Sequence, residues 1–285
     1  MIKTFSFESP RGSEMPLLHS QYFNLIDIEG MTLAAAELGT TTVPFVDGDL
    51  VNNIQAMPRT ITLYLKLKET AGIETAKRYI LRFVKFKMAC KLHLEQDGRD
   101  IVIEGRVEGI ELPRMSDEGS VMVITMHCSQ PYWSDVDYVV AELSELINLH
   151  YFPVEEGGLA FPVDGVPFGV YDDDLTQELD NGGDVETGVI ITIIATGTVI
   201  NPKIYNTETG QYIGINDTLT GGDYVTISTI KGQKTITKNG ENVIDKIMSG
   251  STFLQLAAGE NYFTIEAQSG VDSVYFTIQF KQLYV

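Results

Sequence analysis

The sequence predicts a mainly β protein with one amphipathic helix, divided into two domains. Three observations predict this class: apolar and polar residues alternate along most of the chain, tight-turn dipeptides separate the alternating runs, and one segment shows helical spacing. A chain of 285 residues is long enough for about two domains. We expect an N-terminal β domain over residues 1–150 and a C-terminal β-sandwich over residues 151–285.

The first half of the chain reads as an antiparallel sheet. In the segment 60–68, apolar residues stand at every second position, which is the period of a half-buried strand. These residues are Ile61, Leu63, Leu65 and Leu67. Residues 91–112 read as two strands joined by a hairpin turn at Asp97 and Gly98, and residues 120–129 as a further strand. We also expect the strand at 60–68 to offer an edge that a neighbouring molecule extends through main-chain hydrogen bonds.

One helix is expected over residues 74–86, with Thr70 and Gly72 as start signals. Its apolar positions are Ala76, Ile80, Phe83 and Val84. Its opposite side carries the basic residues Lys77, Arg78, Arg82 and Lys85. This basic stripe is either a solvated helix face or a docking surface for an acidic neighbour.

The middle of the chain is less regular. Residues 138–149 fit either a short helix or an extended connector, and the pattern does not decide between them. Proline and glycine are dense between Pro153 and Gly169, which predicts the domain boundary there.

From Val185 onward, short strands and turn signals recur every 8 to 12 residues or so, as in a β-sandwich. Asn239 and Gly240 predict a hairpin. In the segment 236–268 we expect three consecutive strands, with turns at Ser249–Gly250 and at residues 258–261.

Charge and cysteine content narrow the function classes. The formal net charge is −19, with 21 acidic and 14 basic residues in 1–150 and 18 against 6 in 151–285. Such acidity argues against tight nucleic-acid binding, which needs cations that displace counterions from phosphates. No run approaches the ~18 apolar residues of a membrane span. Cys90 and Cys128 are expected to be buried thiols.

No motif predicts a catalytic, cofactor or metal site, so we expect no enzyme and no cofactor. Cys90, His93, His127 and Cys128 supply four zinc-type ligands. Strand geometry places Cys90 and His93, and likewise His127 and Cys128, on opposite faces of a strand, which argues against a zinc site.

An acidic cluster fits either calcium binding or a solvated entry to the second domain, and it comprises Asp172, Asp173, Asp174, Asp180, Asp184 and Glu186. Sugar stacking would depend on tyrosines, namely Tyr205, Tyr212, Tyr224, Tyr262 and Tyr275.

The order of the motifs resembles the distal tail protein family of long-tailed, non-contractile phages. The first block is FNLIDIEGMTL, VPFVDGDLV and MPRTITLYLKL, over residues 23–67, and HCSQPYWSD closes the first domain. The second block runs from LAFPVDGVPFG to the final FTIQF. The resemblance implies an N-terminal domain that forms a six-fold ring and a galectin-like C-terminal sandwich.

In that family the ring joins the tail tube to the tail-tip hub and to receptor-binding proteins. The resemblance therefore implies a structural virion protein at the tail tip, made in the host cytoplasm, which lets DNA pass without binding it specifically. The alternative is a carbohydrate-binding adhesion module, and an enzyme acting on cell-wall glycan is a third hypothesis.

Overall fold

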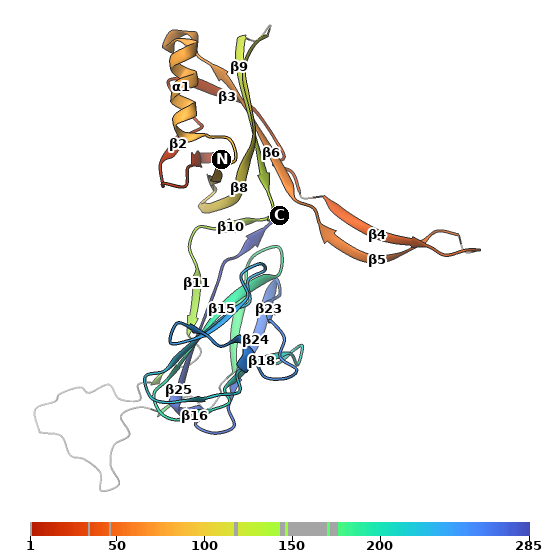
Figure 1. Cartoon of the computed structure of the whole chain (residues 1–285), viewed down its shortest axis with the longest axis vertical. Coiled ribbons are helices and arrows are strands. Elements are labelled where there is room, and N and C mark those ends of the chain that lie inside the picture. The colour runs from red at the N-terminus through yellow and green to blue at the C-terminus, as the bar shows by residue number, and fades with distance from the viewer. Residues whose placement is uncertain are drawn as a thin grey trace, which may run out of the picture. The chain divides into compact units, whose positions relative to one another are not determined.

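The structure, a computed structural model, describes residues 2–33, 35–45, 47–116, 119–142, 146–147, 170–171 and 176–285. The chain forms two compact units, Met1–Val136 with Leu283–Val285, and Asp137–Gln282 (Figure 1). The predicted border at residues 150 and 151 and the proline-rich and glycine-rich segment lie outside the described residues, so the domain limits stay a prediction. Among the described residues, no helix is long and apolar enough to cross a membrane.

The first unit is built on one antiparallel sheet whose main path runs β2-β1-β7-β8-β9-β6-β3. The strands are β1 (Ile2–Glu8), β2 (Glu14–Pro16), β3 (Phe23–Glu29), β6 (Arg59–Leu67), β7 (Ala89–Gln96), β8 (Arg99–Ser116) and β9 (Gly119–Cys128). A short strand, β10 (Trp133–Asp135), pairs with β8 and with β26 (Leu283–Tyr284) from the end of the chain.

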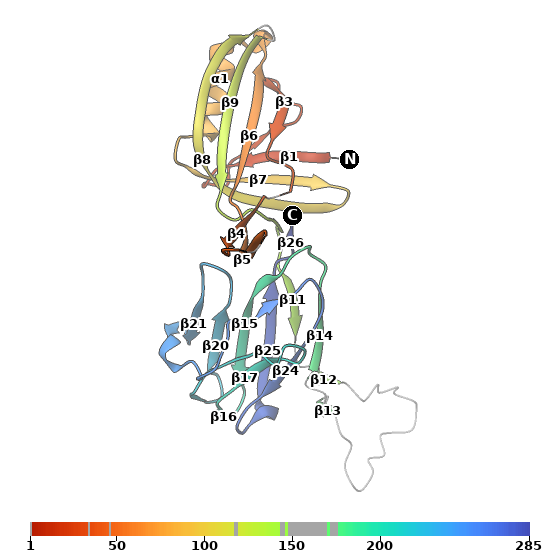
Figure 2. The same cartoon turned by 90° about the vertical axis from the view of Figure 1, so that its right-hand side faces the viewer.

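Strand β8 belongs to both halves of this sheet, the half with β7 and the half with β9, and it bends along its length (Figure 2). Its first part pairs with β7 up to Arg106, and its later part pairs with β9. The register with β9 shifts between Val107 and Gly109, which leaves Glu108 as an extra residue. A bulge of this kind increases local twist and bends the strand. The two halves can therefore close over one core.

Helix α1 (Ile73–Phe83) covers that core and follows a short 3-10 turn, η1 (Glu69–Ala71). The predicted helix is confirmed, although it ends at Phe83 because Val84 adopts an extended conformation. Gly72 caps its start with a φ of 79°, which glycine accepts readily. Ala76 and Ile80 are buried against the alternating apolar side chains of β6.

The predicted free edge on residues 60–68 is wrong. Strand β6 is paired on both sides, with β3 through register pairs such as Leu25 and Leu65, and with β9 through pairs such as Leu63 and Ile124. Its main-chain groups are therefore already used within the sheet. Alternation alone shows which face of a strand is buried, but not which strands lie beside it.

Both predicted two-residue hairpin turns are confirmed. Asp97 and Gly98 have φ values of 52° and 86°, and Asn239 and Gly240 have the same two values. Positive φ at both central residues gives the type I′ turn whose twist matches the flanking strands.

The second unit is a sandwich of two antiparallel sheets (Figure 2). One sheet has the order β11-β25-β15-β20-β21-β22, with β23 also paired to β15, and the other has the order β14-β24-β17-β18. The strands of the first sheet are β11 (Val139–Glu142), β15 (Thr187–Ala195), β20 (Tyr224–Ser228), β21 (Thr235–Lys238), β22 (Glu241–Asn242), β23 (Gln255–Leu256) and β25 (Val274–Phe280). Those of the second are β14 (Thr176–Asn181), β17 (Lys203–Asn206), β18 (Tyr212–Gly214) and β24 (Gly259–Glu266).

Smaller elements complete the unit. They are β12 (Leu146–Ile147) paired with β13 (Val170–Tyr171), β16 (Val199–Ile200) paired with β19 (Thr218–Leu219), and the 3-10 turns η2 (Ile244–Lys246) and η3 (Val271–Ser273). The undecided segment 138–149 is extended where the structure describes it, in β11 and β12. The core lies between the two sheets and includes Ile191, Phe263 and Phe276. The predicted mainly β class is thus confirmed.

The predicted turn over residues 258–261 is wrong, because β24 already begins at Gly259. The chain instead changes sheets at this point, from β23 beside β15 to β24 beside β14. Two fully buried asparagines stabilise the segment in which the chain passes from one sheet to the other. Asn181 donates to the carbonyls of Leu256 and Ala257, and Asn261 both accepts from and donates to the main chain of Ala257. These side chains satisfy main-chain groups that leave the sheet ladders.

Candidate assembly surface

A hairpin arm stands between β3 and β6 in the chain. Its strands, β4 (Ala36–Thr42) and β5 (Asp49–Ala56), pair only with each other in the sheet topology. Figure 1 shows them side by side as a separate ribbon. Every residue of both strands is exposed. This is the longest fully exposed paired segment among the described residues.

The arm is amphipathic, because the register of its two strands places most of the apolar side chains on one face. Ala36 opposes Ala56, Leu38 opposes Ile54, and Thr40 opposes Val51, so these side chains share one face. The register shifts between Gly39 and Thr40, and this shift returns Val51 to the apolar side. We call this set, Ala36, Leu38, Val51, Ile54 and Ala56, the apolar arm face.

The opposite face of the arm is mostly polar. Glu37 opposes Gln55, whose Nε2 donates to Glu37 Oε2 at 2.9 Å. Thr41 lies on the same face, at the position opposite Leu50. The two faces of one hairpin therefore differ in chemistry, as they do in a sheet with one side packed and one side solvated.

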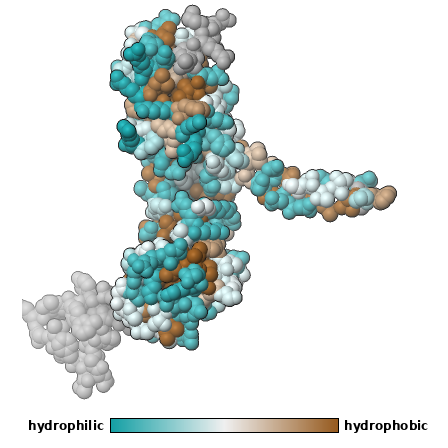
Figure 3. All heavy atoms as spheres, in the orientation of Figure 1, coloured by the Kyte–Doolittle hydropathy of each residue, from teal (hydrophilic) through white to brown (hydrophobic). Residues whose placement is uncertain are grey.

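The apolar arm face is incomplete without a covering partner. Leu38 is 55% exposed and Ile54 67% exposed, and Phe45, between the two strands, is fully exposed. Figure 3 shows hydrophobic surface along the arm and at its tip. Burying an aliphatic side chain of this size contributes about 1.5–3 kcal/mol, whereas an isolated two-stranded hairpin is marginal in water. The arm is therefore suited to pack against another protein surface.

A second surface is the face of the first sheet that points away from α1. Tyr64 lies on it, because it alternates with the buried Leu63 and Leu65. Its hydroxyl donates to Glu29 at 3.0 Å. That hydrogen bond, followed by burial and the charges of Glu29, Asp27 and Glu111, raises the pKa of Tyr64. Three carboxylates therefore surround Tyr64 on this face, which also carries Lys66 two residues further along β6.

The basic stripe on α1 is partly neutralised. Lys77 and Arg78 both pair with Glu74, at 2.7 and 3.1 Å. Arg82 is exposed, and Lys85, which is also exposed, lies beyond the end of the helix. Solvent-exposed pairs within one helix contribute little to stability, because water and salt screen the charges. The stripe therefore fits a solvated face better than a preformed docking site.

The four zinc-type residues do not converge. Cys90 and Cys128 are buried in the core of the first unit, whereas His93 lies on the other face of β7 and contacts Glu8 at 2.6 Å. Within the described ranges, no group of three or more His, Cys, Asp or Glu side chains is placed to hold a metal ion.

Of the acidic cluster, Asp172, Asp173 and Asp174 lie outside the described residues, and Glu186 pairs with Lys231 at 3.0 Å.

Both thiols are expected to resist thiol–disulfide exchange in the folded protein. Burial is the main cause that raises the pKa of Cys90 to about 12 and that of Cys128 to about 11. The reactive thiolate fraction at pH 8 is then far below that of a free cysteine. Titration with a chromogenic disulfide should show no fast-reacting thiol in the native protein and two in denaturant. A fast native reaction would contradict the buried placement.

Two of the five candidate tyrosines come together. Tyr205 and Tyr212 are cross-strand partners on β17 and β18, and both line one open pocket. Tyr224, Tyr262 and Tyr275 lie on other strands and do not line it. The single tryptophan, Trp133, is buried in the first unit and cannot stack on a ligand.

The fold and its surfaces define a class of protein: a two-unit β protein with an unpartnered amphipathic arm, which is typical of a component of a larger assembly. The comparisons agree with this class. Residues 182–284 match the family model described as the siphovirus-type tail component, C-terminal domain. Over these residues the second unit is similar to the C-terminal domain of a siphovirus-type tail component, and the resemblance to the distal tail protein family is confirmed.

One solved structure extends the likeness in fold over 99% of the chain. The crystal structure of the Dit protein of phage SPP1 has a TM-score of 0.67 at 12% identity, covering 99% of this chain and 100% of that one. A chain of the phage P2 baseplate has a TM-score of 0.49 at 10% identity, covering 99% and 98%. At these identities the likeness concerns the fold. The comparison with curated proteins found no match.

Proposed function

We propose that this protein is the ring-forming hub of a siphophage tail tip, which joins the tail tube to the tail-tip hub and to receptor-binding proteins. The apolar arm face carries the proposal, because it is a large surface without a partner in the single chain. The SPP1 Dit structure, whose fold this chain shares, is described as a paradigm of hub adsorption apparatus in phages that infect Gram-positive bacteria. We infer a structural role at the tail tip of the virion, and no catalytic one.

A closed ring would cover every copy of the arm. In a ring each subunit uses two different surfaces, so the arm of one copy packs on a non-arm surface of the next. Each arm is then covered by one neighbour, and the non-arm surface of each copy receives the arm of one other neighbour. We infer a ring of six copies, as in the distal tail protein family.

The carboxylates around Tyr64 on this face of the first sheet suit the lumen of such a ring. Asp27, Glu29 and Glu111 place negative charge around Tyr64. A lining of cations would bind DNA phosphates and slow the passage of DNA, whereas carboxylates repel them. This face therefore fits a conduit that DNA passes without being held.

Light scattering and electron microscopy of the purified protein, alone and mixed with its tail-tube and tail-tip neighbours, test the proposal. We expect rings of about six subunits, six being the copy number that the family resemblance implies for a closed cyclic assembly. Chains that stay monomeric and bind neither neighbour would overturn it.

A further inference from the structure

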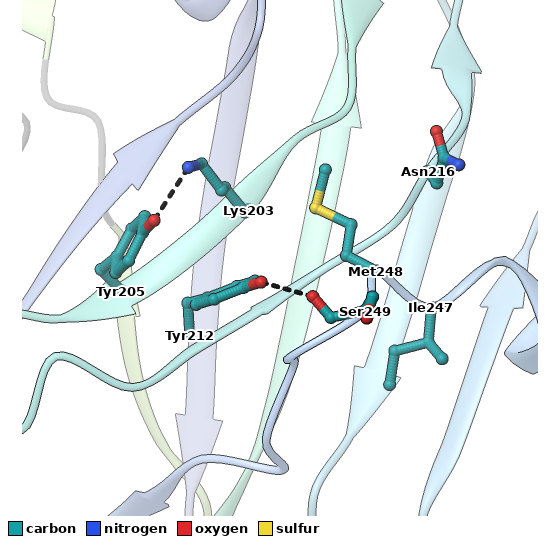
Figure 4. A pocket seen from close by; sticks show the side chains of 7 residues that line it. All are labelled: Lys203, Tyr205, Tyr212, Asn216, Ile247, Met248 and Ser249. Atoms are coloured by element: carbon teal, nitrogen blue, oxygen red, sulfur yellow. Dashed lines mark hydrogen bonds between the residues drawn. The ribbon is translucent and has the colours of Figure 1, made fainter.

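An open pocket lies on the sandwich of the second unit, beside β17, β18 and the segment 247–249, with a volume of about 360 Å³. Its lining includes Lys203, Tyr205, Tyr212, Asn216, Met248 and Ser249 (Figure 4). Lys203 and Tyr205 alternate with the buried Ile204, so their side chains point away from the sandwich core. The size falls in the range of about 300–1,000 Å³ that is usual for small-ligand sites.

The two tyrosine rings are held in fixed orientations. Their centroids are 5.1 Å apart and their planes differ by 41°. The Lys203 ammonium donates to the Tyr205 hydroxyl at 2.8 Å, and the Tyr212 hydroxyl donates to the carbonyl of Ser249 at 2.6 Å. The Lys203 ammonium also lies over the two rings, 4.6 Å from the Tyr205 centroid and 5.8 Å from the Tyr212 centroid. The rings can therefore offer a ligand the apolar surface that Lys203 leaves uncovered.

Lys203 also pairs with Glu266 at 2.9 Å. The hydrogen bond to Tyr205, and then that to Glu266, raise its pKa, so the side chain stays charged at neutral pH. An ammonium has three donors, and two are used by these contacts. One donor remains for a ligand, together with the side-chain amide of the exposed Asn216.

The backbone builds the pocket as well. A Cβ on Gly214 would lie 2.6 Å from Lys203 Cβ and 2.7 Å from Met248 Sδ. A Cβ on Gly250 would lie 2.9 Å from the Tyr212 hydroxyl, and Gly250 has a φ of 86°. Glycine at these two positions therefore gives room to the side chains that form the walls.

Charge decides which ligand class fits. The Lys203 charge is balanced by Glu266, and residues 151–285 hold 18 acidic against 6 basic side chains. A polyanion would be repelled by this domain. A pyranose ring has an apolar C–H face that packs on aromatic rings and hydroxyls that accept hydrogen bonds. We propose that this pocket binds a neutral saccharide, with Tyr205 and Tyr212 as the stacking platform and Lys203 and Asn216 as donors.

Isothermal titration of the full chain with neutral tetrasaccharides of glucose, galactose and N-acetylglucosamine tests the proposal, with a glycerol phosphate polymer as the anionic probe. We expect at least one neutral probe to bind and the anionic probe not to bind. Tyr205→Ala and Tyr212→Ala should each weaken binding at least about tenfold, a difference of about 1.4 kcal/mol. Tyr212→Phe keeps the ring but loses the hydrogen bond to Ser249 that orients it, so it should bind more tightly than Tyr212→Ala.

Tyr224→Ala is the matched control, because Tyr224 is a partly exposed tyrosine of the same unit that does not line the pocket. It should leave binding unchanged, and thermal melts should show that all variants are folded. Absence of binding to every neutral probe would overturn the proposal, as would binding that survives both alanine changes. Ring assembly is measured separately by light scattering, so its failure is distinguishable from the failure of saccharide binding.

Discussion

Placing two carboxylates on the apolar arm face, by Leu38→Asp with Ile54→Asp, should abolish ring formation. The two side chains oppose each other across the hairpin and are 55% and 67% exposed in the single chain. Burying them against a neighbour would contribute about 3–6 kcal/mol per interface, and burying carboxylates there costs further free energy. Since 1.4 kcal/mol is a factor of ten, each interface should weaken at least about 100-fold.

The arm offers a control with the same change in charge. Thr41→Asp with Asn53→Asp also adds two carboxylates, on the face opposite to Leu38 and Ile54. Rings should persist in this variant. Size-exclusion chromatography with light scattering should give the mass of a single chain, 31.5 kDa, for Leu38→Asp with Ile54→Asp. It should give the mass of the ring for the control variant. Rings that survive Leu38→Asp with Ile54→Asp would show that another surface carries the assembly.

Neither variant should alter folding of the single chain. All four substituted positions are exposed, and they lie outside both hydrophobic cores. Surface substitutions away from special features usually change stability by no more than about 0.5 kcal/mol. The thermal midpoint of the isolated chain is therefore expected to stay close to that of the wild type, which separates lost assembly from lost folding.

The sequence predicted the elements that follow a simple period or a strong local rule. Alternation on Ile61, Leu63 and Leu65 identified a strand with one buried face, and two Asx-Gly pairs identified hairpins. These signals are local, because the pleat and the turn conformation are set by neighbouring residues. The helix was found for the same reason, from its 3.6-residue spacing.

The arm was missed although Asp47 and Gly48 form an Asx-Gly pair between its two strands, because the alternation in the strands themselves is weak. The strand AELGTTT has weak alternation, and the register shift beside Gly39 moves Val51 onto the face of Leu38. A bulge changes the face of a residue without leaving a clear trace in the sequence. The pocket depends likewise on the pairing of Tyr205 with Tyr212 and on the distant Ser249, which only the tertiary fold brings together.

The two units are expected to unfold as separate cooperative blocks. Each has its own hydrophobic core, and Phe276 is fully buried in the second. Removing a buried phenylalanine ring costs about 3–5 kcal/mol. Phe276→Ala should therefore lower the midpoint of the second unit strongly. Leu65 is fully buried in the first unit. Leu65→Ala should lower the free energy of unfolding of that unit by about 2–5 kcal/mol, and its midpoint with it.

Trp133 makes the two transitions distinguishable, since it is the only tryptophan and is buried in the first unit. In urea titrations, its fluorescence midpoint should move with Leu65→Ala and stay in place with Phe276→Ala, while circular dichroism follows both units. The end of the chain provides a link, because Tyr284 on β26 pairs with Trp133 on β10. A fluorescence midpoint that drops equally in both variants would mean that this strand makes the two units one cooperative block.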